Sequence, residues 1–246
     1  MTTERIAAAR ADLAPTGCLR VGLNYGNFLL VTKNAASGAY SGVAVDLATE
    51  LARQLGVPFE IVAYETAGKM ADAVKTGAWD VAFLGAEPAR AGEIAFTAAY
   101  LEIESSYLVT AQSPIRTIAE VDRAGVRIAV AEKSAYDLYL ARSIKHATLV
   151  RAPGIDASYK IFVEQKLDAL AGLRPRLVMD AEKLPGSRIL EGRFTAVQQA
   201  IGTPQARASG AHFLRAFAEE AKASGRVARA IAANGVRGVS VAAAAQ

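Results

Sequence analysis

Residues 76–100 read TGAWDVAFLGAEPARAGEIAFTAAY, a stretch in which a short apolar run leads directly into a charged turn. The run 81–84 is apolar and is bounded by turn-forming residues, so it predicts a buried strand. Pro88 suits the first position of a helix, which places Arg90 in the first turn of that helix. A strand that feeds at once into a helix is the repeating step of a sheet covered by helices, and this stretch therefore predicts an α/β fold.

Two further strands and two helices are predicted on the N-terminal side of this stretch. Residues 19–23 and 59–63 form short apolar runs typical of strands. Between them, residues 43–55 place apolar side chains on one helical face, and Gly56 is a typical helix end. A second helix is predicted over 70–75. Together these elements form one β-α-β-α-β unit.

The same order of elements restarts after Pro114 and predicts a second unit. Strands at 126–131, 148–150 and 167–170 alternate with helices at 134–144 and 158–165. Extended segments near 101–111 and 193–203 are suited to crossing between the units, and 206–224 predicts a long amphipathic helix that packs back on the first.

Two crossings make the first lobe discontinuous. We expect one lobe to contain residues 1–110 and 203–246, and the other to contain residues 111–202. Each lobe is predicted to be a mixed sheet flanked by helices. Because ligands of open α/β sheets bind at the carboxyl ends of the strands, a ligand cleft is expected between the lobes.

Composition excludes several classes of function. The 246 residues carry a net charge of +4 without a basic cluster, so no nucleic-acid partner is expected. The arginine pairs 174/176 and 226/229 are interpreted as polar helix faces. No stretch reaches the about 18 apolar residues of a membrane span, and no secretory leader is visible, so the chain is expected in the cytoplasm unless a signal peptide has been trimmed. The single Cys18 excludes an internal disulfide.

Signals for an enzyme or a cofactor are sparse. The sequence has no nucleophile elbow and no phosphate-binding glycine loop. Its two histidines, His146 and His212, have no metal-ligand spacing to another candidate ligand. We therefore expect no catalytic residue, no metal and no cofactor, although Glu102 and Glu104 on the first crossing segment leave a carboxylate-based catalyst open.

Arg90 is the first candidate for ligand binding. At the end of a strand, a guanidinium can hold a carboxylate with two parallel hydrogen bonds. Gly85 and Glu87, in the same strand end and turn, are expected to line the site with it. The alternative is a surface arginine paired with Glu87 or Glu93.

Lys133, Ser134 and Ala135 are the corresponding candidates in the second lobe. Ser134 is a typical N-cap, and the amides at a helix start favour an anion. In the alternative reading, Ser134 caps its helix and does nothing more.

Aromatic and cationic residues of the first lobe complete the predicted site. Tyr25 follows the first strand and is expected to face the cleft, whereas Phe28 is expected in the core. Lys69 is a weaker candidate for contacting an anion, and a solvated lysine at a helix start is the alternative.

Five stretches of this sequence resemble the amino-acid type (family 3) substrate-binding proteins of ABC transporters. They are LRVGLNYGNF (19–28), SGVAVDLATELARQLGV (41–57), TGAWDVAFLG (76–85), PARAGEIAFTAAY (88–100) and LDALAG (167–172). The fourth is the most specific, because the family's motif carries the arginine that binds a ligand carboxylate, and that arginine falls on Arg90. The resemblance implies the type II periplasmic-binding fold, a small carboxylate ligand, an ABC permease partner, a monomer and a periplasmic location.

Three departures from the family pattern bear on the ligand. Ala44 stands at the usual aspartate, and Ala67 falls near a frequent aromatic wall. Amino-acid binders tend to have an acid just after LDALAG, where it holds the ligand's ammonium, and this chain has Leu173. Either Glu87 or Glu132 replaces that acid, or the ligand is an organic acid without the amine.

Two other functions remain open on the same fold. The stretch AGVRIAV (124–130) resembles cyclohexadienyl or arogenate dehydratases, but Arg174, Pro175 and Arg176 stand where their catalytic glutamate is expected. The second is a cytosolic sensor or sequestering protein, which the missing leader favours.

Overall fold

The computed structural model describes residues 3–245. It divides into two compact units: unit 1 contains the described residues up to Glu102 and those from Gln198 onward, and unit 2 contains Ile103–Val197. The divisions fall inside the two crossing strands β7 (Leu101–Val109) and β12 (Thr195–Pro204), whereas the sequence placed them near the ends of those segments, after residues 110 and 202. The first division falls inside β7 because, from Ser105 onward, β7 pairs with strand β10 of unit 2.

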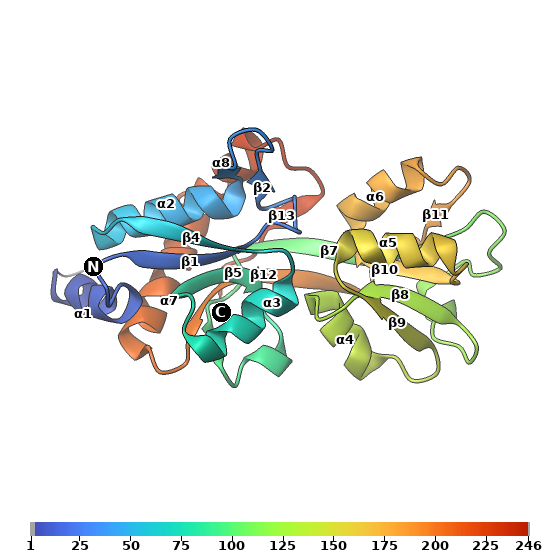
Figure 1. Cartoon of the computed structure of the whole chain (residues 1–246), viewed down its shortest axis with the longest axis horizontal. Helices are drawn as coiled ribbons and strands as arrows, with labels where there is room; N and C mark the ends of the chain where they lie inside the picture. The colour runs from blue at the N-terminus through green and yellow to red at the C-terminus, as the bar shows by residue number, and fades with distance from the viewer. Residues whose placement is uncertain (1–2, 246) are drawn as a thin grey trace. The chain divides into compact units, whose positions relative to one another are not determined.

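Unit 1 contains the predicted β-α-β-α-β unit. Its elements are β1 (Leu19–Asn24), α2 (Val43–Leu55), β4 (Phe59–Tyr64), α3 (Ala67–Asp72) and β5 (Val81–Gly85). The parallel strands lie in the order β4-β1-β5, and β12 pairs antiparallel with β5. The crossovers run in opposite directions along the sheet, so α2 and α3 lie on its opposite faces (Figure 1).

Helix α2 ends as the sequence predicts. Gly56 adopts the left-handed conformation at φ 66°, and its amide and that of Val57 satisfy carbonyls of the last turn. The second predicted helix continues from α3 into a 3₁₀ turn, Ala73–Thr76, which ends at left-handed Gly77. The core beside it is built around Trp79, which is fully buried and donates from Nε1 to the Met70 carbonyl at 2.8 Å.

The long C-terminal helix α7 (Ala208–Ala223) packs on unit 1, with Phe213, Leu214, Phe217 and Ala221 all buried. Its partner α1 (Thr3–Leu13) was not predicted, because an alanine-rich segment with charges on several faces lacks a clear apolar stripe. The close approach of α1 to α7 requires a glycine, because a Cβ at Gly210 would lie 2.5 Å from a methyl carbon of Leu13. The Asp12 carboxylate accepts the Gly210 amide at 2.9 Å.

Unit 2 repeats the alternation of strands and helices found in unit 1. Its elements are β8 (Arg127–Ala131), α4 (Ala135–Ser143), β9 (Thr148–Ala152), α5 (Ile155–Glu164), β10 (Ala169–Leu173) and α6 (Arg174–Glu182). The strand order is β7-β10-β8-β9, and α4 and α5 lie on opposite faces (Figure 1). Leu108, Phe162, Leu170 and Leu177 lie in its core.

Unit 2 departs from the prediction in several places. Helix α5 begins at Ile155 instead of residue 158. Strand β10 begins at Ala169 instead of residue 167, because the Leu167 amide still bonds back to the Phe162 carbonyl of α5. Helix α6 was missed, because the set of elements looked complete after β10.

Short elements complete the description. They are β2 (Thr32–Lys33), β3 (Tyr40–Ser41), β6 (Ile94–Phe96), β11 (Arg188–Ile189), β13 (Val239–Val241), α8 (Arg226–Ala233) and the 3₁₀ turns Pro88–Arg90 and Ile118–Glu120. Between residues 3 and 245, no helix combines the length and the apolar character that a membrane span requires.

Candidate functional site

The carboxyl ends of three parallel strands gather the candidate residues of unit 1. Asn24, Tyr64 and Gly85 end β1, β4 and β5, and the register places these ends at one edge of the sheet. Tyr25 follows β1 directly, Lys69 lies in α3 after β4, and Arg90 lies in the turn after β5. This is the edge at which open α/β sheets bind ligands.

Arg90 is buried at this edge, with 6% of its surface exposed. It closes the 3₁₀ turn Pro88–Arg90, and its Nη1 donates to the Gly85 carbonyl at 2.7 Å. Burial lowers the pKa of Arg90 to about 10, while the charges of Glu87 and Asp72 act against that shift. At neutral pH the side chain is therefore a buried cation, and the alternative of a surface arginine is wrong.

Gly85 and Glu87 hold the turn that carries Arg90. Gly85 is the buried last residue of β5 and lies opposite Gln199 of β12. Glu87 is half-buried and extended, and its carbonyl accepts the Arg90 amide at 2.9 Å. Glu93, the other acid considered as a partner for Arg90, lies 3.3 Å from Lys75. A direct contact of Gly85 or Glu87 with a ligand stays a prediction.

Tyr25 is half-buried beside a second tyrosine. Its ring lies 6.1 Å from that of Tyr40, and the Lys33 ammonium lies 5.6 Å from both ring centres. The Tyr25 amide bonds to the Tyr64 carbonyl at 3.0 Å, which fixes the loop to the strand end. Phe28 is half-buried, so its placement in the core was wrong.

Lys69 fits the alternative reading better than the functional one. Its side chain is 64% exposed and its Nζ lies 2.5 Å from Glu65. That pairing raises the pKa of Lys69 and lowers the pKa of Glu65. The Lys69 amide donates to Thr66 Oγ1, the N-cap of α3.

In unit 2, Ser134 is the N-cap of α4, as predicted. Its Oγ accepts the Asp137 amide at 3.1 Å, while the Asp137 carboxylate accepts the Lys133 amide at 2.8 Å. Lys133 takes a left-handed conformation at φ 53° to enter the helix. Ala135, the first helical residue, is buried. Whether a ligand meets these residues stays a prediction.

Sequence reasoning missed a charged cluster at the end of β10. The Arg174 Nε lies 3.1 Å from the Glu104 carboxylate, its Nη2 donates to the Leu190 and Gly192 carbonyls, and Arg193 lies 3.4 Å from Glu104. The missed signal is similar to the one that singled out Arg90: Arg174 and Pro175 directly follow a strand that ends at Leu173.

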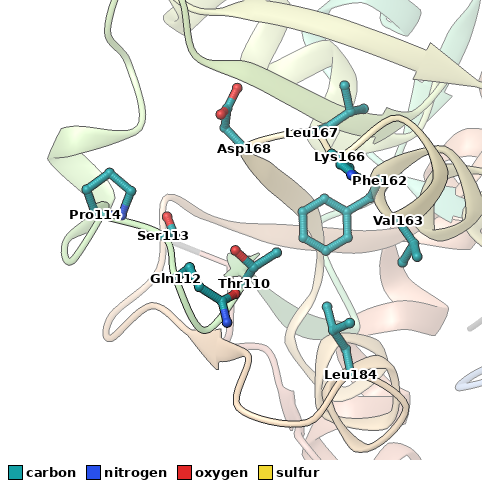
Figure 2. A pocket seen from close by; sticks show the side chains of 10 residues that line it. All are labelled: Thr110, Gln112, Ser113, Pro114, Phe162, Val163, Lys166, Leu167, Asp168 and Leu184. Atoms are coloured by element: carbon teal, nitrogen blue, oxygen red, sulfur yellow. The ribbon is translucent and has the colours of Figure 1, made fainter.

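A pocket of about 420 Å³ lies within unit 2 (Figure 2). Its lining includes the apolar side chains of Phe162, Leu167 and Leu184 and the charged side chains of Lys166 and Asp168. Residue 168 precedes β10 and residue 110 follows antiparallel β7, so this pocket is at the sheet edge opposite Ser134 and Leu173. It is therefore separate from the predicted site.

Within the described range 3–245, no group of three histidine, cysteine or acidic side chains is placed to hold a metal ion.

Comparison with known families decides the class of protein. Residues 19–233 match the bacterial extracellular solute-binding proteins, family 3. The chain belongs to this family. The family that the five motifs indicate is confirmed, and so is the α/β fold class with its type II periplasmic-binding architecture. No curated protein matches the chain.

Solved structures of solute-binding proteins share the fold of this family 3 member. A receptor for L-cysteine from Neisseria gonorrhoeae is 20% identical, with a TM-score of 0.78 over 95% of each chain. A mutant of the Thermotoga maritima protein ArgBP is 22% identical, with a TM-score of 0.75 over 91% of this chain and 97% of that one. The ancestral amino-acid-binding protein AncCDT-1, a precursor of cyclohexadienyl dehydratase, is 19% identical, with a TM-score of 0.74 over 90% and 96%. At these identities the likeness concerns the fold alone.

Proposed function

We propose that this chain is the solute-binding component of an ABC-type uptake system and binds a small carboxylate-bearing solute, an amino acid or a related organic acid. The observation that carries the proposal is the buried Arg90 at the carboxyl end of β5. A protein of this kind binds and releases its solute unchanged, so we propose no catalytic role.

The electrostatics of Arg90 suit an anion. Desolvation is the largest influence on its pKa and disfavours the charged form. A carboxylate brought to the guanidinium would reverse that influence through charge-assisted hydrogen bonds, which are stronger than neutral ones. Anion binding at Arg90 is therefore favoured both by charge and by the fixed planar geometry of the guanidinium.

We further propose ligand contacts for the other predicted residues. In unit 1 these are the Tyr25 ring, Lys69, Gly85 and Glu87; in unit 2 they are Lys133, Ser134 and Ala135. Lys69 has the least support, because its ammonium is already paired with Glu65. We also propose a monomer that acts outside the cytoplasmic membrane and delivers its solute to a permease.

Titration calorimetry with a panel of carboxylates and amino acids tests the proposal. We expect one class to bind, and Arg90→Ala to weaken that binding by about 2 to 5 kcal/mol, as truncation of buried charge-assisted pairs does. Lys75→Ala is the matched control, because Lys75 is an exposed lysine of the same unit. Equal binding by the Arg90→Ala protein and the wild type would refute the role of Arg90.

A dehydratase is the second candidate, because the stretch AGVRIAV (124–130) resembles that class of enzyme. Incubation with prephenate or arogenate separates the two functions. The binding-protein proposal predicts no aromatic product and no release of carbon dioxide above the uncatalysed rate.

A further inference from the structure

The pocket of about 420 Å³ in unit 2 lies at the sheet edge opposite the predicted solute contacts of that unit, and the proposed function leaves it unused. Three segments of unit 2 line it: the loop 110–114 after β7, the end of α5 with the residues that lead into β10, and Leu184 after α6. Figure 2 shows these segments facing one another across the pocket. Its volume falls within the range of small-molecule sites in proteins.

The apolar part of the lining joins the core of unit 2 to the surface. Phe162 and Leu167 belong to that core and are 1% and 3% exposed. Val163, the next residue of α5 after Phe162, is 42% exposed and lines the same pocket. An alkyl or aryl group bound here would remove part of the Val163 side chain from water, which favours binding in proportion to the apolar area covered.

One arginine fixes the loop that forms the facing wall. The Arg188 guanidinium donates to four backbone carbonyls of the segment 110–115: Nη1 bonds to Thr110 at 3.4 Å and to Ala111 at 3.0 Å, and Nη2 bonds to Ser113 and Ile115 at 3.1 Å each. These bonds hold the loop in one conformation. A preformed wall lowers the entropy lost when a small molecule binds.

Lys166 occupies a backbone position that usually belongs to glycine. It follows α5 in the left-handed conformation at φ 47°. Its amide and that of Leu167 bond back to the carbonyls of Val163 and Phe162, which ends the helix. A side chain makes this conformation unfavourable, so the chain carries a lysine at the pocket at a cost in backbone energy. Such outliers are frequent at binding sites.

The charged groups at the pocket leave one cation in excess. The Asp168 carboxylate accepts the Arg127 amide at 2.8 Å and lies 3.6 Å from Arg127 Nε, so these two charges offset each other. Among residues 3–245, no carboxylate lies within ion-pair distance of the Lys166 ammonium, although the Lys166 carbonyl accepts from Arg127 Nη2 at 2.8 Å. The exposed Lys166 side chain is therefore the group that can receive an anion.

We propose that this pocket is a second binding site, which takes a small amphipathic monocarboxylate. The alkyl or aryl body of the ligand covers Val163 and the neighbouring apolar lining, and its carboxylate pairs with the Lys166 ammonium. All of the residues involved belong to unit 2, and Arg90 of unit 1 takes no part. The site is therefore independent of the proposed solute site.

Octanoate is a suitable probe for the intact chain, because it joins an alkyl body to one carboxylate. In ¹⁵N-correlated NMR spectra we expect octanoate to shift the amides of 110–113 and 162–168, and Arg90→Ala to leave these shifts unchanged. Shifts confined to the neighbourhood of Arg90, or no binding at millimolar octanoate, would overturn the inference. Because the Arg90→Ala protein is tested in parallel, failure here leaves the proposed function standing.

Replacing Lys166 tests its ammonium without disturbing the helix end. Glycine suits the left-handed position, so Lys166→Gly removes the charge and keeps the backbone. We expect octanoate to bind about threefold to fivefold more weakly, the size of an exposed ion pair, while octan-1-ol binds as to the wild type. Lys160→Ala, an exposed lysine of the same helix, should change neither. Equal octanoate affinity in the Lys166→Gly and wild-type proteins would refute the inference.

A charge introduced at Val163 gives a second test. Val163→Asp and Val163→Asn place similar shapes at an exposed position of α5 and differ in charge. We expect octanoate to bind the aspartate variant about threefold more weakly than the asparagine variant, because the added carboxylate repels the ligand's own. Octan-1-ol should not distinguish the two. If octanoate does not distinguish them either, its carboxylate does not lie in this pocket and the inference is wrong.

Discussion

At the amino end of strand β5, two guanidinium groups contact the buried Asp80 carboxylate, whereas at the carboxyl end the buried Arg90 guanidinium donates to a backbone carbonyl. Asp80 is fully buried and lies 2.8 Å from Arg20 and 2.6 Å from Arg207. Asp80 raises the pKa of Arg20, while burial lowers the pKa of Arg90.

This difference separates a group of arginines that stabilises an ionised acid from the buried arginine that we propose binds the solute. At the amino end the arginines favour the ionised acid, and the cluster ties together β1, β5 and the segment before α7. At the carboxyl end burial disfavours the charged form of Arg90, and the carboxylate that we propose as the ligand would offset that effect. Substitutions at the two ends should therefore affect different measurements.

The largest expected effect is on stability, at the amino end. Asp80→Ala removes one partner of a buried ion cluster and should lower the free energy of unfolding by about 3 to 5 kcal/mol. Urea unfolding followed by circular dichroism measures this loss. Solute affinity per folded molecule should stay unchanged, and a parallel loss of affinity would show that the two ends of β5 are coupled.

At the carboxyl end, Arg90→Lys sharpens the comparison. A lysine keeps the charge but cannot form two parallel hydrogen bonds, so affinity should fall by about 1.5 to 3 kcal/mol, less than for Arg90→Ala. Calorimetry measures the loss. If the lysine variant binds like the wild type, the planar geometry of the guanidinium plays no part.

Acid should weaken the amino end. Burial raises the pKa of Asp80. The hydrogen bonds from Arg20 and Arg207 together lower it by more, so the pKa of this carboxyl lies below its usual value. The resulting stability is fully present above the ordinary aspartate pKa of about 4 and is lost as pH falls through the lower folded value. It amounts to about 1.4 kcal/mol for each unit of lowering. Unfolding titrations from pH 6 to 2 should be less steep in Asp80→Asn than in the wild type.

Unit 2 supplies the smallest expected effect. Ser134→Ala removes the Oγ that accepts the Asp137 amide, and should cost about 1 kcal/mol of stability as a lost N-cap. A fall in solute affinity well beyond that loss, measured by calorimetry, would support the proposed contact of Ser134 with the ligand. Ser143→Ala, at the other end of the same helix, is the control.

Local signals made the fold predictable from sequence. The apolar stripe of 43–55 with Gly56 after it reproduces α2, and the buried residues of α7 are those that the helical period selects. Helix α1 escaped prediction because its position depends on a tertiary contact, the fit of Leu13 against Gly210. No periodicity within 3–13 encodes that contact.

The candidate site was predictable only in part. The strand-to-helix step pointed to Arg90, and the capping pattern identified Ser134. Neither pattern contains the burial of Arg90 or the pairing of Arg174 with Glu104, a residue 70 positions away in the sequence. Pairs between distant strands depend on sheet register, which a single sequence does not specify.

Trp79, the one tryptophan of the chain, lies fully buried in unit 1 and is fixed by its bond to the Met70 carbonyl. Its fluorescence is therefore an intrinsic reporter of one unit only. Unfolding recorded by tryptophan emission and by backbone circular dichroism will coincide if the units unfold together. If unit 2 unfolds first, emission will change after part of the dichroism signal has been lost, without any label being added.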